Sequence, residues 1–278
     1  MTIGRCPAAS CGRVELVSGP SPRSLRTLTT DAFEHVPALR GKLTPAEHSG
    51  LRATWELIAL WDERARARGL PPDWRLSNEE LESTRQAMLG EHLAGRDLWV
   101  YGYGSLMWDP GFHFVEVRLA ELQGHRRRFC YRSTLGRGSR ERPALMLALQ
   151  RGSGSCTGLA FRVAAPQVDA ESAALWRREM LRGGYSPALL PVATPQGEVT
   201  ALAMTANTAH ADYVGELALE DTAAMIAGAS GMLGSNRDYL EQLAAQLETL
   251  GIDDPYVQRL RRRVLALAAH SVAGSAPE

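Results

Sequence analysis

The chain has almost no lysine and no net charge. Position 42 holds its single lysine, so arginine supplies nearly all of the positive charge, and 31 basic residues balance 31 acidic ones. A chain without net charge has no general attraction to nucleic acid or to an anionic membrane surface. We therefore expect neither kind of partner, and we interpret the arginine excess as a compositional bias.

Long apolar runs are absent as well. No stretch approaches the roughly 20 residues that a membrane-spanning helix needs. Residues 1–19 lack the continuous apolar core of a secretory signal. The sequence predicts a cytoplasmic protein without a membrane partner.

Cysteine is scarce, with four residues at positions 6, 11, 130 and 156. Cys6 and Cys11 have no companion histidines, so a zinc site is not expected there. Cys130 and Cys156 lie in or beside strand-like segments, where small buried thiols are common. We expect all four to be reduced and none to be catalytic.

Motifs for metals, nucleotides and a nucleophilic serine are missing too. The histidines show no HExxH or other paired spacing, and no Gly-Lys-Ser/Thr of a phosphate-binding loop is present. Ser105 does not lie in a G-x-S-x-G frame. The sequence therefore predicts neither a metal nor a cofactor.

What is present is the composition of an ordinary globular protein, with 45% hydrophobic and 22% charged residues among 278. That length suffices for one large domain with appendages. Residues 1–28 are rich in Gly, Ser, Pro and Arg and are expected to be a flexible tail. A helical extension over 29–96, a main domain over 97–270 and a flexible tail over 271–278 are expected to follow.

Two helices are expected in the N-terminal extension. Residues 44–47, TPAE, combine an N-cap, a proline at the first helical position and a capping-box glutamate, and Pro71-Pro72 ends that element. A second capping box, SNEE at 77–80, opens another helix, with Gly90 and Gly95 as stop signals. We interpret the pair as a lid, a brace or a dimer contact.

From residue 98 the pattern becomes strand-like, with short turns instead of regular helices between most segments. This favours an α+β fold with a mixed or antiparallel sheet that closes into a small β-barrel flanked by helices. A helix over 168–181 interrupts the strands, and two or three helices follow, two of them over 235–250 and 254–269. The expected strands cover 98–103, 114–121, 125–132, 144–150, 156–163, 188–193 and 199–206.

The segment 98–112, LWVYGYGSLMWDPGF, is the most informative stretch. Its bulky apolar residues 98–101 predict a buried strand, and the glycine-flanked turn at 102–105 can expose successive backbone N–H groups. Such a concave row of donors is a cradle for an anion or a carbonyl oxygen. An ordinary turn is the alternative. A dinucleotide site does not fit, because Met107 occupies the place of the third small residue.

Glu179 is the second conspicuous residue. It follows Leu175 and Trp176 by four and three residues, so it projects from the buried side of the expected helix. A carboxylate there is costly unless it is hydrogen-bonded or used, and burial would raise its pKa toward that of a general base. The alternative is an exposed glutamate paired with Arg178 or Arg182.

The run Arg126-Arg127-Arg128 superficially suggests RNA binding, because aromatic residues follow it. Alternation along a strand would place these arginines on two faces and dilute any patch. We interpret them as a solvated strand edge or as a contact to a substrate carboxylate.

Together these features resemble one family, the ChaC-type gamma-glutamylcyclotransferases, over about residues 40–268. The chain departs from the family pattern at Pro143-Ala144, where relatives usually carry Pro-Gly, and in its longer N-terminal extension. The five matching segments, in the family's order, are the substrate loop at 99–112, the strand GHRRRF at 124–129, the strand GLAFR at 158–162, Arg178-Glu179 with Gly183-Gly184-Tyr185 at the catalytic helix and turn, and the C-terminal helical signature at 231–251.

The resemblance implies that residues 97–270 are the catalytic domain of a glutathione-specific gamma-glutamylcyclotransferase. In that reaction the glutamyl α-amine attacks its own γ-carbonyl and yields 5-oxoproline and Cys-Gly, with no cofactor. The resemblance also implies Glu179 as the general acid and base, a small-molecule substrate as the partner, and a monomer or homodimer. The implied substrate-binding residues are Tyr101, Gly102, Tyr103, Gly104, Ser105, Leu106 and Tyr185.

Two other functions stay open from the sequence. One is a cyclotransferase that acts on other gamma-glutamyl amino acids or amines. The other is a non-catalytic regulatory binding protein on the same fold.

Overall fold

The computed structural model describes Met1 and residues 31–273, with side-chain surroundings up to residue 269. Beyond Met1, the expected tail at 1–28 lies outside the described residues, and so do Cys6 and Cys11. At the other end, the last helix continues to Ala273, three residues into the expected C-terminal tail.

A five-stranded mixed sheet forms the centre of the fold, in the order β2-β3-β1-β5-β4. The central strand β1 pairs antiparallel with β3 and parallel with β5. The mixed sheet and its flanking helices confirm the expected α+β class. The strands are β1 Leu98–Gly102, β2 Glu116–Ser133, β3 Ala144–Val163, β4 Tyr185–Val192 and β5 Val199–Ala206.

The sheet curls until its two edges meet at one point. Glu121 of β2 and Ala193, the residue after β4, exchange two backbone hydrogen bonds of 2.8 and 2.9 Å. This isolated bridge is the one point at which the edge strands are paired, so the curled sheet is not a continuously closed barrel.

Two pairs of expected strands are in fact two long, bent strands. The expected strands at 114–121 and 125–132 are both parts of β2, and those at 144–150 and 156–163 are both parts of β3. The register of the β2–β3 pair shifts between Gln123 and His125. Gly124, with φ +69°, sits at this shift in a conformation that glycine adopts without strain. The glycine signal therefore marked a bulge, not a chain reversal.

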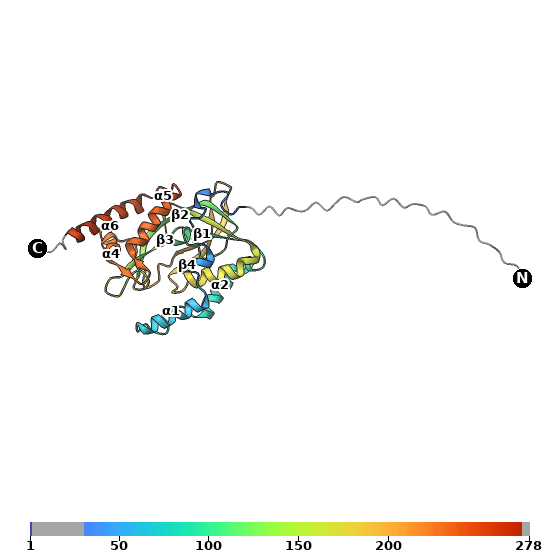
Figure 1. The fold of residues 1–278 in the computed structure, drawn as a ribbon, viewed down its shortest axis with the longest axis horizontal. Coiled ribbons are helices and arrows are strands. Elements are labelled where there is room, and N and C mark those ends of the chain that lie inside the picture. Colours follow the sequence, from blue (N-terminus) through green and yellow to red (C-terminus); the bar gives the residue numbers. More distant parts are fainter. Residues whose placement is uncertain (2–30, 274–278) are drawn as a thin grey trace.

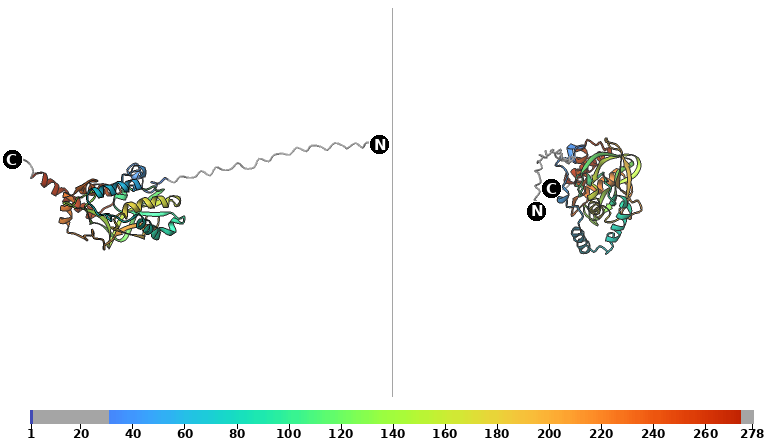
Figure 2. Two further views of the ribbon diagram at one scale, coloured as in Figure 1. Left: turned by 90° about the horizontal axis from the view of Figure 1, so that it is seen from below. Right: turned by 90° about the vertical axis from the view of Figure 1, so that its right-hand side faces the viewer.

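Six helices surround the sheet in the described part of the chain (Figures 1 and 2). In Figure 1, α4, α5 and α6 gather at one end of the molecule and α1 lies along its lower edge. Within the described residues, no helix combines the length and apolar character needed to cross a bilayer. The helices are α1 Trp55–Ala67, α2 Asn78–Leu93, α3 Val168–Glu179, α4 Leu219–Gly228, α5 Asn236–Thr249 and α6 Pro255–Ala273.

The expected start of the first helix at 44–47 is wrong. Thr44 donates its backbone N–H to the Trp108 carbonyl at 2.9 Å, which holds this segment against the body of the protein. Helix α1 begins only after Thr54, whose hydroxyl accepts the Leu57 N–H at 3.3 Å. Residues Ala46–His48 form only a short 3-10 helix, in which the His48 N–H donates to the Pro45 carbonyl at 2.9 Å, and the chain does not continue from it into α1.

The second capping box forms as expected. Ser77 and Glu80 exchange their reciprocal hydrogen bonds at 3.1 and 2.7 Å. Helix α2 then passes through Gly90 and ends at Leu93, just before Gly95. Of the two glycine stop signals, Gly95 is the one that acts, and it has a positive φ of 109°.

The N-terminal extension is fastened to helix α3. The Arg85 guanidinium reaches the Asp169 carboxylate and the Ser172 hydroxyl, both at 2.8 Å. The indole of the buried Trp176 donates to the Thr84 hydroxyl at 3.0 Å. Because these bonds connect α2 with α3, the extension braces the helix that carries Glu179.

A buried amide joins α5 to the sheet and offers a test of this packing. Asn236 is fully buried, accepts the Leu145 N–H at 2.7 Å and donates to the Leu145 carbonyl at 2.9 Å. Asn236→Ala leaves both backbone groups unpaired, so the free energy of unfolding should fall by about 2–4 kcal/mol in urea titrations. The exposed neighbour variant Arg237→Ala should change it by less than about 0.5 kcal/mol. Equal effects of the two variants would contradict this account.

Candidate active site

The turn after β1 is built by close packing. A Cβ atom on Gly102 would lie 3.1 Å from the Leu106 Cβ, and one on Gly104 would lie 3.2 Å from the Tyr239 hydroxyl. The Gln246 amide donates to the Met107 carbonyl at 2.6 Å and ties the turn to α5. Glycine is needed here because the turn lies so close to its neighbours.

Arg178, next to the last residue of α3, ties that helix to this turn. Its guanidinium donates to the Asp109 carbonyl at 2.8 Å, to the Pro110 carbonyl at 3.3 Å and to the Ser105 hydroxyl at 3.0 Å. The planar fork of arginine suits such simultaneous contacts. One side chain thus sets the distance between the turn and the end of α3.

Glu179 is the final residue of α3, and only 14% of its side chain is exposed. Burial raises the pKa of the Glu179 carboxyl, and the positive charge of Arg178 opposes that shift without cancelling it. The Arg178 Nε lies 3.0 Å from a carboxylate oxygen. The negative end of the helix dipole also disfavours an ionised carboxylate at this position.

Three tyrosines lie within the electrostatic reach of Glu179. Burial raises the pKa values of Tyr103, Tyr185 and Tyr239, and the negative charge of Glu179 adds to each shift. For Tyr239 the resulting pKa is about 12. All three phenols are therefore protonated at neutral pH.

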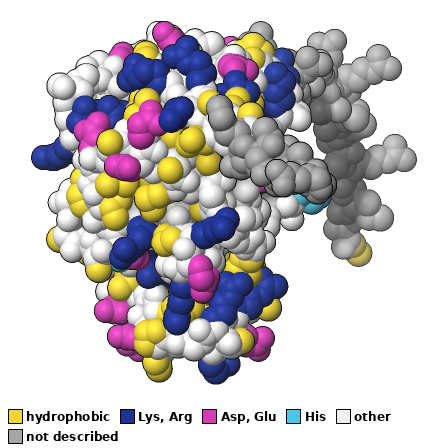
Figure 3. Space-filling model, turned by 90° about the vertical axis from the view of Figure 1, so that its left-hand side faces the viewer, with side chains coloured by type: hydrophobic (Ala, Val, Ile, Leu, Met, Phe, Trp, Pro, Cys, Tyr) yellow, Lys and Arg dark blue, Asp and Glu magenta, His cyan; other side chains and the backbone are white. Residues whose placement is uncertain are grey.

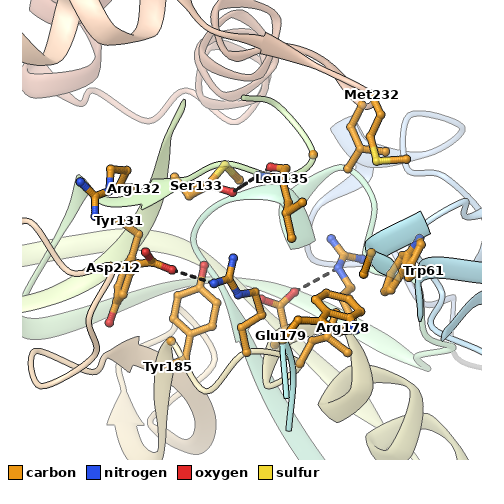
Figure 4. A pocket seen from close by; sticks show the side chains of 18 of the residues that line it. Trp61, Tyr131, Arg132, Ser133, Leu135, Arg178, Glu179, Tyr185, Asp212 and Met232 are labelled. Carbon is orange, nitrogen blue, oxygen red and sulfur yellow. Dashed lines mark hydrogen bonds and ion pairs between the residues drawn. The ribbon is translucent and has the colours of Figure 1, made fainter. Parts of the chain in front are cut away.

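Glu179 lines a pocket of about 320 Å³. Figure 4 shows Glu179 and Tyr185 near its centre, Tyr131 on one side, and Trp61 and Met232 on the other. The walls come from the ends of β2 and α3, from the start of β4, from the segment around Met232 and from helix α1. An elongated ligand could therefore contact both the sheet and the N-terminal extension.

The structure separates the expected site residues into two groups. Glu179 and Tyr185 line the pocket, whereas Tyr101 to Leu106 do not. The Tyr101 hydroxyl donates to the Cys156 carbonyl at 2.5 Å, and the Tyr103 hydroxyl donates to the Met204 carbonyl at 2.8 Å. The turn therefore lies behind Arg178, which is itself part of the pocket wall.

Sequence reasoning missed Tyr239 and the pocket residues of α1. Tyr239 lies in the 231–251 segment, and its oxygen makes a hydrogen bond with the Ser105 backbone. That segment carried a family signal, but a single sequence does not show which of its side chains turns toward Glu179. For α1, the sequence predicted a helix but not what its residues cover.

The arginine run at 126–128 serves the fold. Arg127 is buried, with its Nε 3.3 Å from an Asp254 carboxylate oxygen. Arg126 and Arg128 both pair with Glu216, at 2.9 and 3.1 Å. None of the three lines the pocket of Glu179, and their position on the edge strand β2 favours the strand-edge interpretation over a contact to a substrate carboxylate.

Among the residues that the structure describes, no three His, Cys, Asp or Glu side chains are grouped as a metal site would require.

Comparison with known proteins gives consistent matches. A family model described as "ChaC-like protein" matches residues 98–267. A protein of Escherichia coli (strain K12) named "Glutathione-specific gamma-glutamylcyclotransferase" is 38% identical over 192 residues, which cover 67% of this chain and 83% of that protein. "Glutathione-specific gamma-glutamylcyclotransferase 1" of Danio rerio is 33% identical over 181 residues, which cover 63% and 92%.

A solved structure supports the fold assignment. The crystal structure of a yeast gamma-glutamyl cyclotransferase specific to glutathione superposes with a TM-score of 0.58 at 21% identity. The match covers 63% of this chain and 98% of the yeast chain. At this identity it shows a shared fold and nothing finer.

The raised pKa of Glu179 predicts how stability changes with pH. The folded state binds this proton more tightly than the unfolded chain, whose ordinary value is 4.5. The stabilisation from the proton is complete below that value and is lost as the pH rises through the folded pKa. The Glu179→Gln side chain is neutral at every pH. The free energy of unfolding of this variant minus that of the unmodified protein should therefore rise as the pH increases from 4.5 through the folded pKa of Glu179. Urea titrations from pH 4 to 8 measure the difference.

A matched carboxyl should behave in the opposite way. A backbone hydrogen bond from Ser77 lowers the pKa of Glu80 below its ordinary value of 4.5. Its stabilisation is present above that value and is lost as the pH falls through the folded pKa. The relative stability of Glu80→Gln should therefore decrease as the pH rises. The same trend in both variants would contradict the assignment for Glu179.

Proposed function

The chain belongs to the ChaC-like protein family, and from this membership we propose that it is a glutathione-specific gamma-glutamylcyclotransferase. The observation that carries the proposal is the buried carboxylate of Glu179, which faces a pocket within the segment that the family model matches. The reaction class is supported because cyclisation needs a base at the substrate amine and no bound oxidant or reductant.

The chemistry is an intramolecular amide exchange. The glutamyl α-ammonium loses a proton to Glu179, and the freed amine attacks the γ-carbonyl carbon of the same residue. A C–N bond of the five-membered lactam forms, and the C–N bond to the cysteinyl nitrogen breaks. Two protons pass in total from the attacking nitrogen to the leaving amine, and Glu179 can carry each of them in turn. The products are 5-oxoproline and Cys-Gly.

The pocket supports this reaction through position and proton affinity. The attacking α-amine and the γ-carbonyl belong to one glutamyl residue. A pocket that holds this residue in a bent conformation therefore brings the two groups together at high effective molarity. An α-amino group has a pKa of about 8, far above that of an ordinary carboxyl. The raised pKa of Glu179 narrows this gap and makes the proton transfer easier.

We assign two kinds of role to the remaining residues. Tyr185 contacts the substrate, because it lines the pocket beside Glu179. Residues 101–106 do not line the pocket and act indirectly. The Ser105 hydroxyl accepts a hydrogen bond from Arg178 and so holds this pocket residue in place. A direct contact between their backbone N–H groups and the glutamyl carboxylate or the developing oxyanion stays a prediction.

The setting of the enzyme belongs to the same proposal. We infer a cytoplasmic protein that acts as a monomer or homodimer on a small-molecule substrate. The balanced charge of 31 basic and 31 acidic residues supports the inference that nucleic acid and membranes are not partners.

Incubation of the purified protein with glutathione tests the function directly. 5-Oxoproline and Cys-Gly should appear in equal amounts, as measured by mass spectrometry. Release of 5-oxoproline from γ-glutamyl-alanine or a γ-glutamyl amine, but not from glutathione, would show a different substrate class. No release from any of them would favour a non-catalytic binding protein.

Removing the base should abolish most turnover without unfolding the protein. Glu179→Gln should lower kcat by about 10²- to 10⁴-fold, the usual contribution of a positioned proton carrier. Asp221→Asn removes an exposed carboxylate from α4 that does not line the pocket, and it should leave kcat nearly unchanged. Full activity of the Glu179 variant would refute its role as the base.

The pH dependence of the rate follows from the same group. Glu179 accepts a proton only when it is ionised, so kcat/KM should rise as the pH increases through its raised pKa and then level off. The midpoint should lie above the ordinary glutamate value of 4.5. A rate that is flat from pH 4 to 7, or that falls as the pH rises, would contradict this role.

A further inference from the structure

Helix α1 forms part of the pocket wall, although it lies outside the segment that the family model matches. Trp61, Arg64, Ala65 and Arg68 all line the pocket. Their spacing of three and four residues places them on one face of the helix. The N-terminal extension therefore supplies a boundary of the pocket that the matched segment does not contain.

The junctions between the extension and the body hold this wall in place. The Arg177 guanidinium donates to the Ala53 carbonyl at 2.6 Å, immediately before α1. After α1, the Leu76 N–H donates to the Leu181 carbonyl at 2.9 Å, two residues beyond Glu179. On the pocket side, an Arg68 Nη lies 3.7 Å from the Met232 sulfur. Helix α1 is thus held by hydrogen bonds before its first residue and after its last, and Arg68 at its C-terminal end contacts Met232.

The pocket contains more positive than negative charge. Arg178 pairs with Glu179, and Arg182 pairs with Asp212 at 3.0 Å. The other arginines that line it, Arg64, Arg68 and Arg132, have no carboxylate partner among the described residues. Figure 3 shows basic side chains at the lower end of the molecule, where α1 lies in Figure 1.

Arg64 and Arg68 are particularly suited to an anion. They are four residues apart on one helix, so their like charges repel and destabilise α1 by about 0.2–0.5 kcal/mol. A carboxylate between them would remove that repulsion and could accept hydrogen bonds from both guanidinium groups. Arg132 is less suited, because the Asp212 carboxylate lies on its side of the pocket (Figure 4).

We propose that helix α1 forms the subsite for the leaving half of the substrate, with Arg64 and Arg68 binding the C-terminal glycine carboxylate of glutathione. This inference rests on the proposed function. The scissile amide must lie at Glu179, so the Cys-Gly half extends away from it by up to two residues, or about 7 Å. The apolar ring of Trp61 lines the same pocket and can cover the cysteinyl part.

A neutral analogue of the substrate tests the subsite without altering the protein. The C-terminal amide of glutathione, γ-glutamyl-cysteinyl-glycinamide, keeps the reacting groups and the length but lacks the glycine charge. The unmodified protein should show a kcat/KM about tenfold higher for glutathione than for this amide, as expected for a charge-assisted hydrogen bond. The difference should lie in KM, because the glycine end takes no part in bond formation.

The protein variants complete the test. Arg64→Gln combined with Arg68→Gln should raise KM for glutathione about tenfold, leave kcat and the kinetics of the amide unchanged, and so abolish the preference. Arg66→Gln removes an arginine from the same helix that does not line the pocket, and it should keep the preference.

The possible failures are distinguishable. Release of 5-oxoproline from neither compound would overturn the proposed function. Turnover of both compounds without a preference in the unmodified protein would overturn the α1 subsite alone. A preference that survives in the double variant, or that is lost in Arg132→Gln instead, would also overturn it.

Discussion

The guanidinium of Arg178 is the contact on which the site depends. It joins the end of α3 to the turn after β1 through Ser105, Asp109 and Pro110, and it lies beside the carboxylate of Glu179. A bare ion pair would hold Glu179 ionised and poorly basic. Here burial raises the pKa of Glu179 by more than the positive charge of Arg178 lowers it, so the pKa stays raised. The same side chain therefore positions the base and leaves it able to take up a proton.

Burying a carboxylate at the negative end of a helix is unfavourable for folding, and the surrounding structure offsets this cost. The extension fastens α3 through the contacts of Arg85 with Asp169 and Ser172 and through the Trp176 indole. The turn after β1 supplies Tyr103 and the start of β4 supplies Tyr185, and both phenols stay protonated near the carboxylate. These contacts hold α3 in place, so the fold tolerates at its end the carboxyl of raised pKa that the chemistry needs.

The sequence predicted correctly those features that depend on residues close to one another along the chain. The spacing from Leu175 and Trp176 placed Glu179 on the buried side of its helix, and the second capping box marked the start of α2 correctly. The failures involve distant partners. The pairing of Arg127 with Asp254 and the bond from Thr44 to Trp108 join segments that no periodicity connects. For the same reason only the assembled fold shows that Trp61 lines the pocket and that Tyr239 lies near Glu179.

The glycine turn after β1 shows how a motif can be located correctly for an incomplete reason. Its sequence suggested exposed N–H groups that cradle a ligand, yet the turn is packed behind Arg178, with Gly102 and Gly104 in close contact with Leu106 and Tyr239. A larger residue at either glycine would push this turn away and carry the Arg178 contacts with it. Glycine is required here by the distance between two elements, and a contact of the N–H groups of the turn with the substrate stays a prediction. A motif of this kind controls chemistry through position, because a misplacement of about 1 Å at the reacting groups already costs a large factor in rate.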